Sequence, residues 1–297
     1  MTILRPVRVA ILGAGLMGAQ IGCEYALGGH DVALVARDAA AAAERFERAL
    51  ALVREHGLAT PEQVEDAAAR TKESSDLGAA AACDLAVESV PEDLALKAGL
   101  LRVIAEASPD AILATNTSSL SITELGEAIG APERTIGTHY WNPPLLMPLV
   151  EVVPGEGTSP DVVARVRETL RGLGKRSVVV ERDVPGFVWN RLQMAMLREA
   201  VWIVENGAAS TETVYEVLRY GLARRWSNIG FFQAIALGGV GTWQRVGANL
   251  LPELSAATEL PDLRRWVAAD GGGLAEVVRR RDRGLVEDLL RDREVEE

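Results

Sequence analysis

Three glycines near the start of the chain limit its possible folds more than any other feature. They are Gly13, Gly15 and Gly18, spaced G-x-G-x-x-G between an apolar run that predicts a strand and a segment with helical periodicity. This pattern predicts a dinucleotide-binding turn, in which the first glycine allows the tight turn, the second leaves room for a pyrophosphate and the third lets the helix lie close to the strand. The backbone N–H groups at the start of the helix, from Leu16 and Met17 onward, would then receive the phosphate charge.

Short apolar runs alternate with helical patterns up to about residue 182. Such alternation predicts an α/β fold with a Rossmann-type, doubly wound and mostly parallel sheet. After the turn-like segment 183–186 the pattern is helical, so we predict a dinucleotide-binding domain over residues 1–182 and an all-α substrate and dimerisation domain over 183–297. The predicted strands are 8–12, 32–35, 85–88, 112–114, 135–137, 149–153 and 177–181, and the predicted helices include 16–28, 40–56, 92–107, 159–173, 188–206, 211–219, 227–248 and 273–291.

Charge and cysteine content narrow the possible partners. The formal net charge of −11 argues against binding to nucleic acid or to an anionic membrane. Cys23 and Cys83 lie in apolar runs without metal-ligand spacing, which predicts buried thiols in a reducing compartment and no metal site. With neither a signal-peptide pattern nor an uncharged apolar stretch of membrane-spanning length, the sequence predicts a cytoplasmic protein.

The second predicted strand ends without the acidic residue that NAD-binding domains carry at this point. There a carboxylate bonds the ribose hydroxyls, but here the position is Ala36, followed by Arg37 and Asp38. A guanidinium pairs with the 2′-phosphate of NADP and can stack on adenine, whereas a carboxylate would repel that phosphate. We therefore predict a preference for NADP through Arg37. In the alternative, Asp38 reaches the ribose of NAD and Arg37 is a surface residue.

Polar residues that could carry catalysis lie at three of the later strands. Asn116 and Ser118 come directly after a strand, at the edge where such sheets bind ligands. His139 follows another short strand, and Glu151 lies in an apolar strand, where a charge is costly unless it is paired. Oxidation of an alcohol needs a base for the hydroxyl proton, and histidine suits that role. On spacing alone, a structural histidine remains the alternative.

Taken together, the motifs resemble the 3-hydroxyacyl-CoA dehydrogenase superfamily over nearly the whole chain. The matching stretches are Gly13-Ala-Gly-Leu-Met-Gly18, Val87-Glu-Ser-Val-Pro-Glu92 with Lys97, Asn116-Thr-Ser-Ser-Leu120, His139-Tyr-Trp-Asn-Pro143, Leu149-Val-Glu-Val152, Gly174-Lys175 and Pro185-Gly-Phe-Val-Trp-Asn190-Arg191. The resemblance implies that His139 is the acid/base and Glu151 its partner. It also implies a homodimer formed largely through the helical domain.

The same resemblance implies the remaining site residues. Ser118 and Asn190 would hydrogen-bond the substrate oxygen, although each could instead cap a helix if its residue pattern is considered alone. Further residues would contact the cofactor, most of them near its nicotinamide half; they are Glu92, Lys97, Asn116, Ser118 and Asn142.

Two departures from the acyl-CoA enzymes bear on the substrate. In place of a Pro-Met-Gly-Pro-like turn the chain has the segment 221–232, and it lacks their Gly-Phe-Tyr tail. Both features look more like the L-gulonate 3-dehydrogenase and lambda-crystallin branch, whose substrates are free hydroxy acids, and Arg225 could clamp a carboxylate bidentately.

The expected activity is therefore the NAD(P)-dependent interconversion of a 3-hydroxy and a 3-keto carboxylic acid. One alternative is a 3-hydroxyacyl-CoA thioester as the substrate. Another is a catalytically silent, crystallin-like cofactor-binding protein. For Arg225 the alternative to a substrate clamp is a surface residue.

Overall fold

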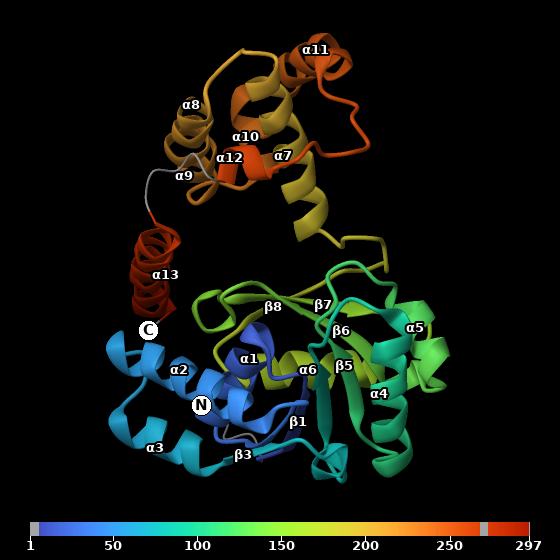
Figure 1. Cartoon of the computed structure of the whole chain (residues 1–297). Coiled ribbons are helices and arrows are strands. Elements are labelled where there is room, and N and C mark those ends of the chain that lie inside the picture. The colour runs from blue at the N-terminus through green and yellow to red at the C-terminus, as the bar shows by residue number, and fades with distance from the viewer. Residues whose placement is uncertain (1–5, 268–272, 297) are drawn as a thin grey trace. The chain divides into compact units, whose positions relative to one another are not determined.

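The computed structural model describes residues 6–267 and 273–296, which form two compact units (Figure 1). The first unit comprises the described residues up to Val188 together with those from Val277 onward, and the second runs from Trp189 to Glu276. The units therefore divide six residues beyond the boundary expected at 182/183. Residues 183–188 stay with the sheet because Phe187 is buried in a cluster with Ile122, Val153 and Val180.

The first unit is built on one eight-stranded sheet with the order β3-β2-β1-β4-β5-β6-β7-β8. Strands β1 to β6 run parallel, β7 pairs antiparallel with β6, and β8 runs parallel to β7. The predicted mostly parallel, doubly wound sheet is confirmed. Its strands are β1 (Arg8–Leu12), β2 (Asp31–Val35), β3 (Thr71–Ser74), β4 (Leu85–Glu88), β5 (Ile112–Thr115), β6 (Thr135–Tyr140), β7 (Leu149–Pro154) and β8 (Arg176–Val179).

Helices cover both faces of this sheet (Figure 1). Because side chains alternate along a strand, Val9 and Ile11 of β1 join one core and Ala10 and Leu12 join the other. The first core contains residues of α1 (Leu16–Leu27), α2 (Ala39–Glu55), α3 (Pro61–Ala69) and α6 (Pro160–Gly172), and the second contains residues of α4 (Leu94–Ala107) and α5 (Ile122–Ile129). Short 3₁₀ turns lie at η1 (Leu77–Ala80), η2 (Pro132–Arg134) and η3 (Pro144–Leu146).

The second unit is helical throughout its described residues, as predicted. Among those residues only Ala234 and Ser255 are buried, so this unit has almost no core of its own. Its elements are α7 (Trp189–Glu205), α8 (Thr211–Glu216), the π-helix η4 (Val217–Ala223), α9 (Arg224–Trp226), α10 (Phe231–Gly238), α11 (Val240–Leu250), η5 (Leu251–Glu253), α12 (Arg264–Val267) and the start of α13 (Leu274–Glu296).

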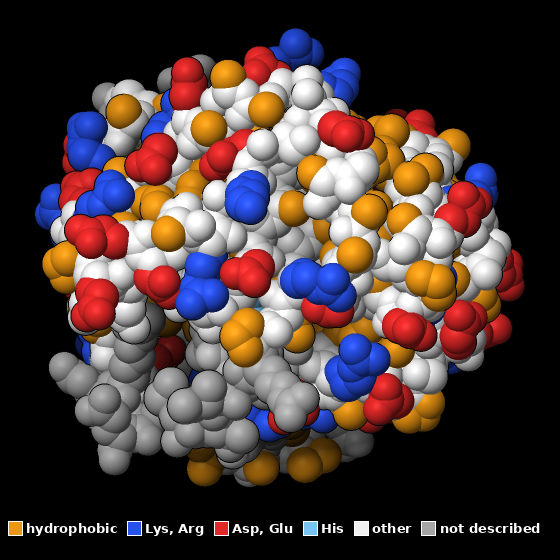
Figure 2. Space-filling view, turned by 90° about the horizontal axis from the view of Figure 1, so that it is seen from below, with side chains coloured by type: hydrophobic (Ala, Val, Ile, Leu, Met, Phe, Trp, Pro, Cys, Tyr) orange, Lys and Arg blue, Asp and Glu red, His pale blue; other side chains and the backbone are white. Residues whose placement is uncertain are grey.

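Charged side chains of both signs are exposed on the molecular surface. On the face shown in Figure 2, Lys and Arg side chains lie among Asp and Glu side chains. None of the described helices combines the length and the apolar character needed to cross a membrane.

Candidate active site

The glycine turn joins β1 to α1 in the geometry that phosphate binding needs. Gly13 has a φ of +94°, which favours glycine, and its N–H donates to the Val35 carbonyl at 2.8 Å. A Cβ on Gly15 would meet no atom within 4 Å, whereas one on Gly18 would overlap the Gly13 carbonyl. Gly15 is the N-cap of α1 and has no side chain to cap it, so the first N–H groups of the helix, beginning at Leu16, face the turn with no side-chain cap. This arrangement fits a bound pyrophosphate.

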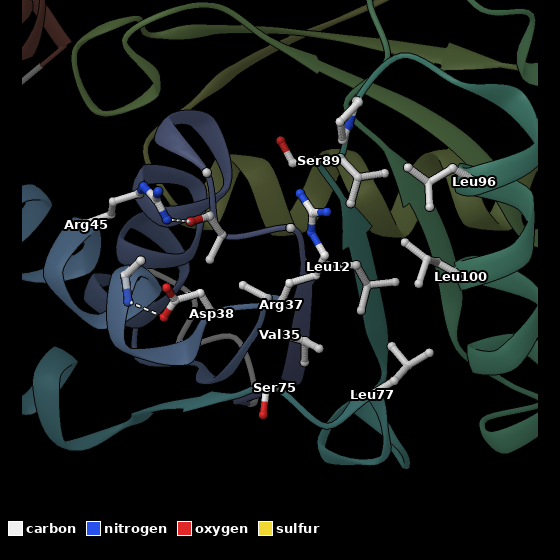
Figure 3. A pocket seen from close by; sticks show the side chains of 17 residues that line it. Leu12, Val35, Arg37, Asp38, Arg45, Ser75, Leu77, Ser89, Leu96 and Leu100 are labelled. Carbon is white, nitrogen blue, oxygen red and sulfur yellow. Dashed lines mark hydrogen bonds between the residues drawn. The ribbon is translucent and has the colours of Figure 1, made fainter.

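A pocket of about 640 Å³ lies beside this turn and is lined by the ends of β1 and β2, the start of α2 and the loop after β4 (Figure 3). Arg37 and Arg45 both line it. The Arg45 guanidinium also donates to the Ala14 carbonyl at 3.3 Å, within the glycine turn. Asp38 lines the pocket too, but its carboxylate caps α2 by accepting from the Ala41 N–H at 3.0 Å. No sequence motif marks Arg45 as a site residue.

His139 and Glu151 form a buried pair on neighbouring strands. They are directly opposite each other in the antiparallel register of β6 and β7, and 2.7 Å separates His139 Nδ1 from Glu151 Oε2. Only 5% of His139 and 1% of Glu151 is exposed. The other Glu151 oxygen accepts from the Val188 N–H at 3.1 Å, and the Phe187 ring packs edge-on against the imidazole. Because Glu151 engages Nδ1, Nε2 is the ring nitrogen that can exchange a proton with a substrate.

The loop after β5 is held by one carboxylate oxygen. Glu92 Oε1 accepts from the Thr117 hydroxyl at 2.5 Å, the Ser118 N–H at 3.0 Å, and the N–H and hydroxyl of Ser119, both at 2.9 Å. Asn116 lies at the start of this loop. Its amide oxygen accepts from the Tyr140 N–H at 2.9 Å, and its amide nitrogen donates to the Ser89 hydroxyl at 3.2 Å. Hydrogen bonds thus join the loops that follow β4, β5 and β6 at one edge of the sheet.

Lys97 lies beneath this loop, inside the protein. Its ammonium is 2.8 Å from Glu88 Oε1 and 3.3 Å from Glu92 Oε2, and only 1% of the residue is exposed. Glu88 is wholly buried at the end of β4. Glu88 is not among the predicted site residues, although it closes an apolar run, where a charge is costly unless it is paired.

A second buried ion pair supports the turn after β6. Lys175 contacts Glu24 of α1 and donates to the carbonyls of Pro144 at 2.7 Å and Met147 at 2.8 Å. Burial raises the pKa of Glu24 to about 7, although the charge of Lys175 opposes that shift. The pair fixes the turn that follows Asn142, a predicted cofactor residue, which is itself exposed.

The remaining predicted residues belong to the second unit. Asn190 is in the first turn of α7, and Arg225 lies in α9, where its side chain is exposed. The first unit thus brings Glu92, Asn116, Ser118, His139 and Glu151 to the same edge of its sheet through the hydrogen bonds described above.

Comparison with known proteins gives matches along most of the chain. A family model described as 3-hydroxyacyl-CoA dehydrogenase, NAD binding domain, matches residues 8–184. A second model, described as 3-hydroxyacyl-CoA dehydrogenase, C-terminal domain, matches residues 186–269.

Individual proteins also match this chain over most of its length. The chain is 37% identical over 253 residues to 5-formyl-3-hydroxy-2-methylpyridine 4-carboxylate 5-dehydrogenase of Mesorhizobium japonicum, covering 83% of this chain and 81% of the relative. It is 32% identical over 296 residues to L-carnitine dehydrogenase of Oceanobacillus iheyensis, covering 98% and 92%. Among solved structures, that of 5-formyl-3-hydroxy-2-methylpyridine 4-carboxylic acid 5-dehydrogenase, described as an NAD⁺-dependent dismutase, matches with a TM-score of 0.83 and 31% identity, covering 95% of this chain and 97% of the other.

Proposed function

Because the chain belongs to the 3-hydroxyacyl-CoA dehydrogenase family and is an NAD-dependent dehydrogenase that acts on a CH–OH group, we propose that it interconverts a 3-hydroxy and a 3-keto carboxylic acid. The observation that carries this proposal is the buried contact of 2.7 Å between His139 Nδ1 and Glu151 Oε2 at the sheet edge. An imidazole held in this way exchanges a proton through Nε2, which is what oxidation of a hydroxyl group requires.

The chemistry divides between the bound nicotinamide and the protein. The cofactor supplies the hydride acceptor in oxidation and the hydride donor in reduction. His139 takes the hydroxyl proton at Nε2, and Glu151 stabilises the imidazolium that results. Ser118 and Asn190 donate hydrogen bonds to the oxygen as it becomes an alkoxide, where preorganised dipoles contribute most. Reduction uses the same residues in the reverse sense.

A variant of the pair tests this mechanism. Glu151→Gln keeps the size of the side chain but removes the charge that stabilises imidazolium, so we expect kcat to fall by roughly 100-fold or more with little change in cofactor affinity. Glu156→Gln, at an exposed position just after the end of β7, is the matched control. Turnover in Glu151→Gln equal to that of the wild type would contradict the assignment. No turnover by the wild type with any substrate would favour the catalytically silent alternative.

A free hydroxy acid is the substrate class we propose. Two relatives are named for compounds that are not CoA thioesters, namely L-carnitine and 5-formyl-3-hydroxy-2-methylpyridine 4-carboxylate. Arg225 would pair with the substrate carboxylate. The family description favours the alternative, a 3-hydroxyacyl-CoA thioester.

A panel of 3-hydroxy acids and their CoA thioesters, assayed by cofactor reduction, separates these substrates. We expect turnover with a free acid. We also expect Arg225→Met to raise the KM for that acid by more than about tenfold. If Arg225→Met leaves this KM unchanged, the proposed role of Arg225 is wrong. Turnover restricted to the thioesters would establish the alternative.

The family model describes an NAD-binding domain, and we further propose that this chain accepts both cofactors but prefers NADP to NAD. Arg37 and Arg45 line the pocket beyond the glycine turn, while Asp38 is engaged as the cap of α2 (Figure 3). Two guanidinium groups favour a 2′-phosphate. We expect Arg37→Asp to lower the ratio of kcat/KM for NADP to that for NAD by roughly tenfold or more, since a charge-assisted hydrogen bond is lost. Arg48→Asp, exposed on the same helix as Arg45, is the control. A wild-type enzyme that prefers NAD would contradict this proposal.

We also propose that the chain forms a homodimer. The exposed apolar side chains of the helical unit support this proposal. Its described residues include almost no buried side chains, and Phe232 and Leu237 are 83% and 76% exposed. A helical unit without a core is stabilised by covering its apolar side chains. A second copy of the chain is the occupant we propose, and light scattering coupled to size exclusion should then give twice the mass of one chain. A monomer at micromolar concentration would contradict it.

A further inference from the structure

Helix α1 carries two polar side chains that engage the turn at η3 or its support. Gln20 and Glu24 are four residues apart and therefore lie on the same side of the helix. The Gln20 amide oxygen accepts from the Leu145 N–H at 3.4 Å, and the Glu24 carboxylate contacts the Lys175 ammonium. Glu24 is only 8% exposed, so its charge needs this cationic partner. The helix that begins at the glycine turn is thus connected to η3 directly through Gln20 and indirectly through Glu24.

Lys175 holds both ends of η3. Its ammonium donates to the Pro144 carbonyl at 2.7 Å and to the Met147 carbonyl at 2.8 Å, and it contacts Glu24. An ammonium group has three N–H donors, which these three protein groups account for. The backbone of Lys175 is fixed as well, because its N–H donates at 2.9 Å to the Leu170 carbonyl in the last turn of α6. Lys175 is therefore a fixed point to which the turn is hydrogen-bonded twice.

The segment that joins β6 to β7 is held on both sides of Asn142. Before it, the Tyr140 N–H donates to the Asn116 amide oxygen at 2.9 Å. After it, η3 is held by Lys175, and Leu146 within that turn is only 1% exposed. Asn142 itself is exposed. The place of Asn142 is therefore set by contacts on either side of it, while its side chain stays accessible to a ligand.

We propose that Glu24 and Lys175 are positioning residues for the nicotinamide half of the cofactor, because they tie the segment that carries Asn142 to the helix that begins at the glycine turn. An α-helix has a fixed rise per residue, so α1 sets the separation between the pyrophosphate end of the site and η3. Glu24 and Lys175 act through the turn, since both are buried. The inference rests on the cofactor contact that the family resemblance implies for Asn142.

Binding of NAD⁺ and of ADP-ribose, which has the adenosine and both phosphates but no nicotinamide, tests this role. We expect Lys175→Met to raise the Kd for NAD⁺ by roughly tenfold and to change the Kd for ADP-ribose by less than about threefold, because only the nicotinamide half loses its support. Isothermal titration measures both values. Lys72→Met, exposed on β3, is the matched control and should change neither. An equal rise for the two ligands, or no rise for NAD⁺, would overturn the proposal.

A second variant separates positioning from a loss of stability. Lys175→Met leaves Glu24 as a buried charge, whereas Glu24→Leu/Lys175→Met removes the whole pair, and apolar replacement of a buried ion pair is often neutral for stability. This double variant still lacks the donors to the Pro144 and Met147 carbonyls. We therefore expect it to show the same selective rise in the Kd for NAD⁺, and it decides the question if Lys175→Met does not fold. Wild-type affinity for NAD⁺ in the double variant would overturn the proposal.

Asn142→Ala distinguishes the positioning role from its premise. We expect this variant to raise the Kd for NAD⁺ but not that for ADP-ribose, and we expect Lys175→Met to add less than about threefold in the Asn142→Ala background. If Asn142→Ala changes neither Kd, the implied contact of Asn142 is wrong and the positioning role is wrong with it. If Asn142→Ala acts as expected but the effect of Lys175→Met is additive, only the positioning role is wrong. These binding measurements need no turnover, so they are independent of the proposed substrate.

Discussion

At the scale of single residues, Glu92 shows how a partly exposed carboxylate can be held ionised. Partial burial alone would raise its pKa, but hydrogen bonds from Thr117 and Ser119 and the charge of Lys97 outweigh burial and lower the pKa from 4.5 to about 2. Because its pKa is lower in the folded state than in the unfolded chain, the ionised carboxylate stabilises the fold above the unfolded value. That stabilisation is lost as the pH falls toward the folded value.

This pKa shift predicts that removing the charge of Glu92 lowers folding stability by an amount that depends on pH. We expect Glu92→Gln to lower the midpoint of unfolding relative to the wild type at pH 7, and the difference to shrink as the pH falls below about 4.5. Denaturant unfolding followed by circular dichroism at pH 7, 4.5 and 3.5 measures this, with exposed Glu65→Gln as the control. A difference that stays constant over this range would contradict the assigned cause.

Single residues also show how far the sequence could predict the site. A charge in an apolar strand needs a partner, which marks Glu151 in the sequence, and in the structure that partner is His139. The same argument applied to Glu88 and Glu24 would have found the two lysine pairs. The contact between Arg45 and the glycine turn could not have been found in this way, because it joins residues on either side of β2 and carries no local pattern.

At the scale of elements, the approach of α1 to β1 depends on one missing side chain. A Cβ on Gly18 would overlap the Gly13 carbonyl, so Gly18→Ala must push the helix away from the turn. We expect the cofactor Kd to rise by roughly tenfold or more, since overpacking of this kind costs about 1–3 kcal/mol. Gly99→Ala on α4 is the matched control, because a Cβ there meets nothing within 4 Å. Isothermal titration with the cofactor measures both, and equal affinities would contradict the close approach.

The turn at η3 is held by Lys175, which predicts another pH-dependent effect. Lys175→Met would leave Glu24 buried without its cation, and breaking such a pair costs roughly 3 kcal/mol. The pKa of Glu24 is already raised to about 7 by burial and would rise further, so the variant stays protonated at a pH where wild-type Glu24 is ionised.

A buried carboxyl group destabilises the fold less when it is protonated than when it is charged. The stability gap between wild type and Lys175→Met should therefore be larger at pH 8.5 than at pH 5.5. Denaturant unfolding at the two pH values measures the gap. An equal gap at both would show that the charge of Glu24 is not its cause.

The elements that the sequence did not predict have weak patterns for physical reasons. Strand β3 reads Thr-Lys-Glu-Ser at the edge of the sheet, so it has no apolar run to mark it. The predicted helix 227–248 is divided between α10 and α11 at Gly239, whose φ of +82° ends the first of them. Strongly periodic helices such as α2 and α6 lie within one residue of their predicted bounds.

At the scale of the whole molecule, the helical unit predicts that stability depends on protein concentration. If a second copy covers Phe232, the wild-type melting temperature should rise with concentration. Phe232→Asp should abolish that dependence and lower the melting temperature by roughly 4 °C or more. Val103→Asp, at an exposed apolar position of the first unit, should change neither. A concentration-independent wild-type melting temperature would contradict the dimer.

The overall division into a sheet unit and a helical unit was readable from the sequence, since strand-like runs stop near residue 182. Phe187 lies in a segment with turn character, and its burial with Ile122, Val153 and Val180 is not visible in the sequence pattern. The domain bounds 1–182 and 183–297 stay a prediction. The cytoplasmic location stays a prediction.

His139 and Glu151 are directly opposite each other on β6 and β7. This pairing limits which changes in this part of the protein keep the two side chains together. The pair is set by the ladder, not by the segment 141–148 that joins the two strands. The alignment of the two strands, and not the length of that segment, therefore keeps His139 and Glu151 together. A shift of one residue, by contrast, would turn Glu151 to the opposite face of the sheet. The alignment of the two strands, more than the segment that joins them, is therefore what a change in this part of the protein has to preserve.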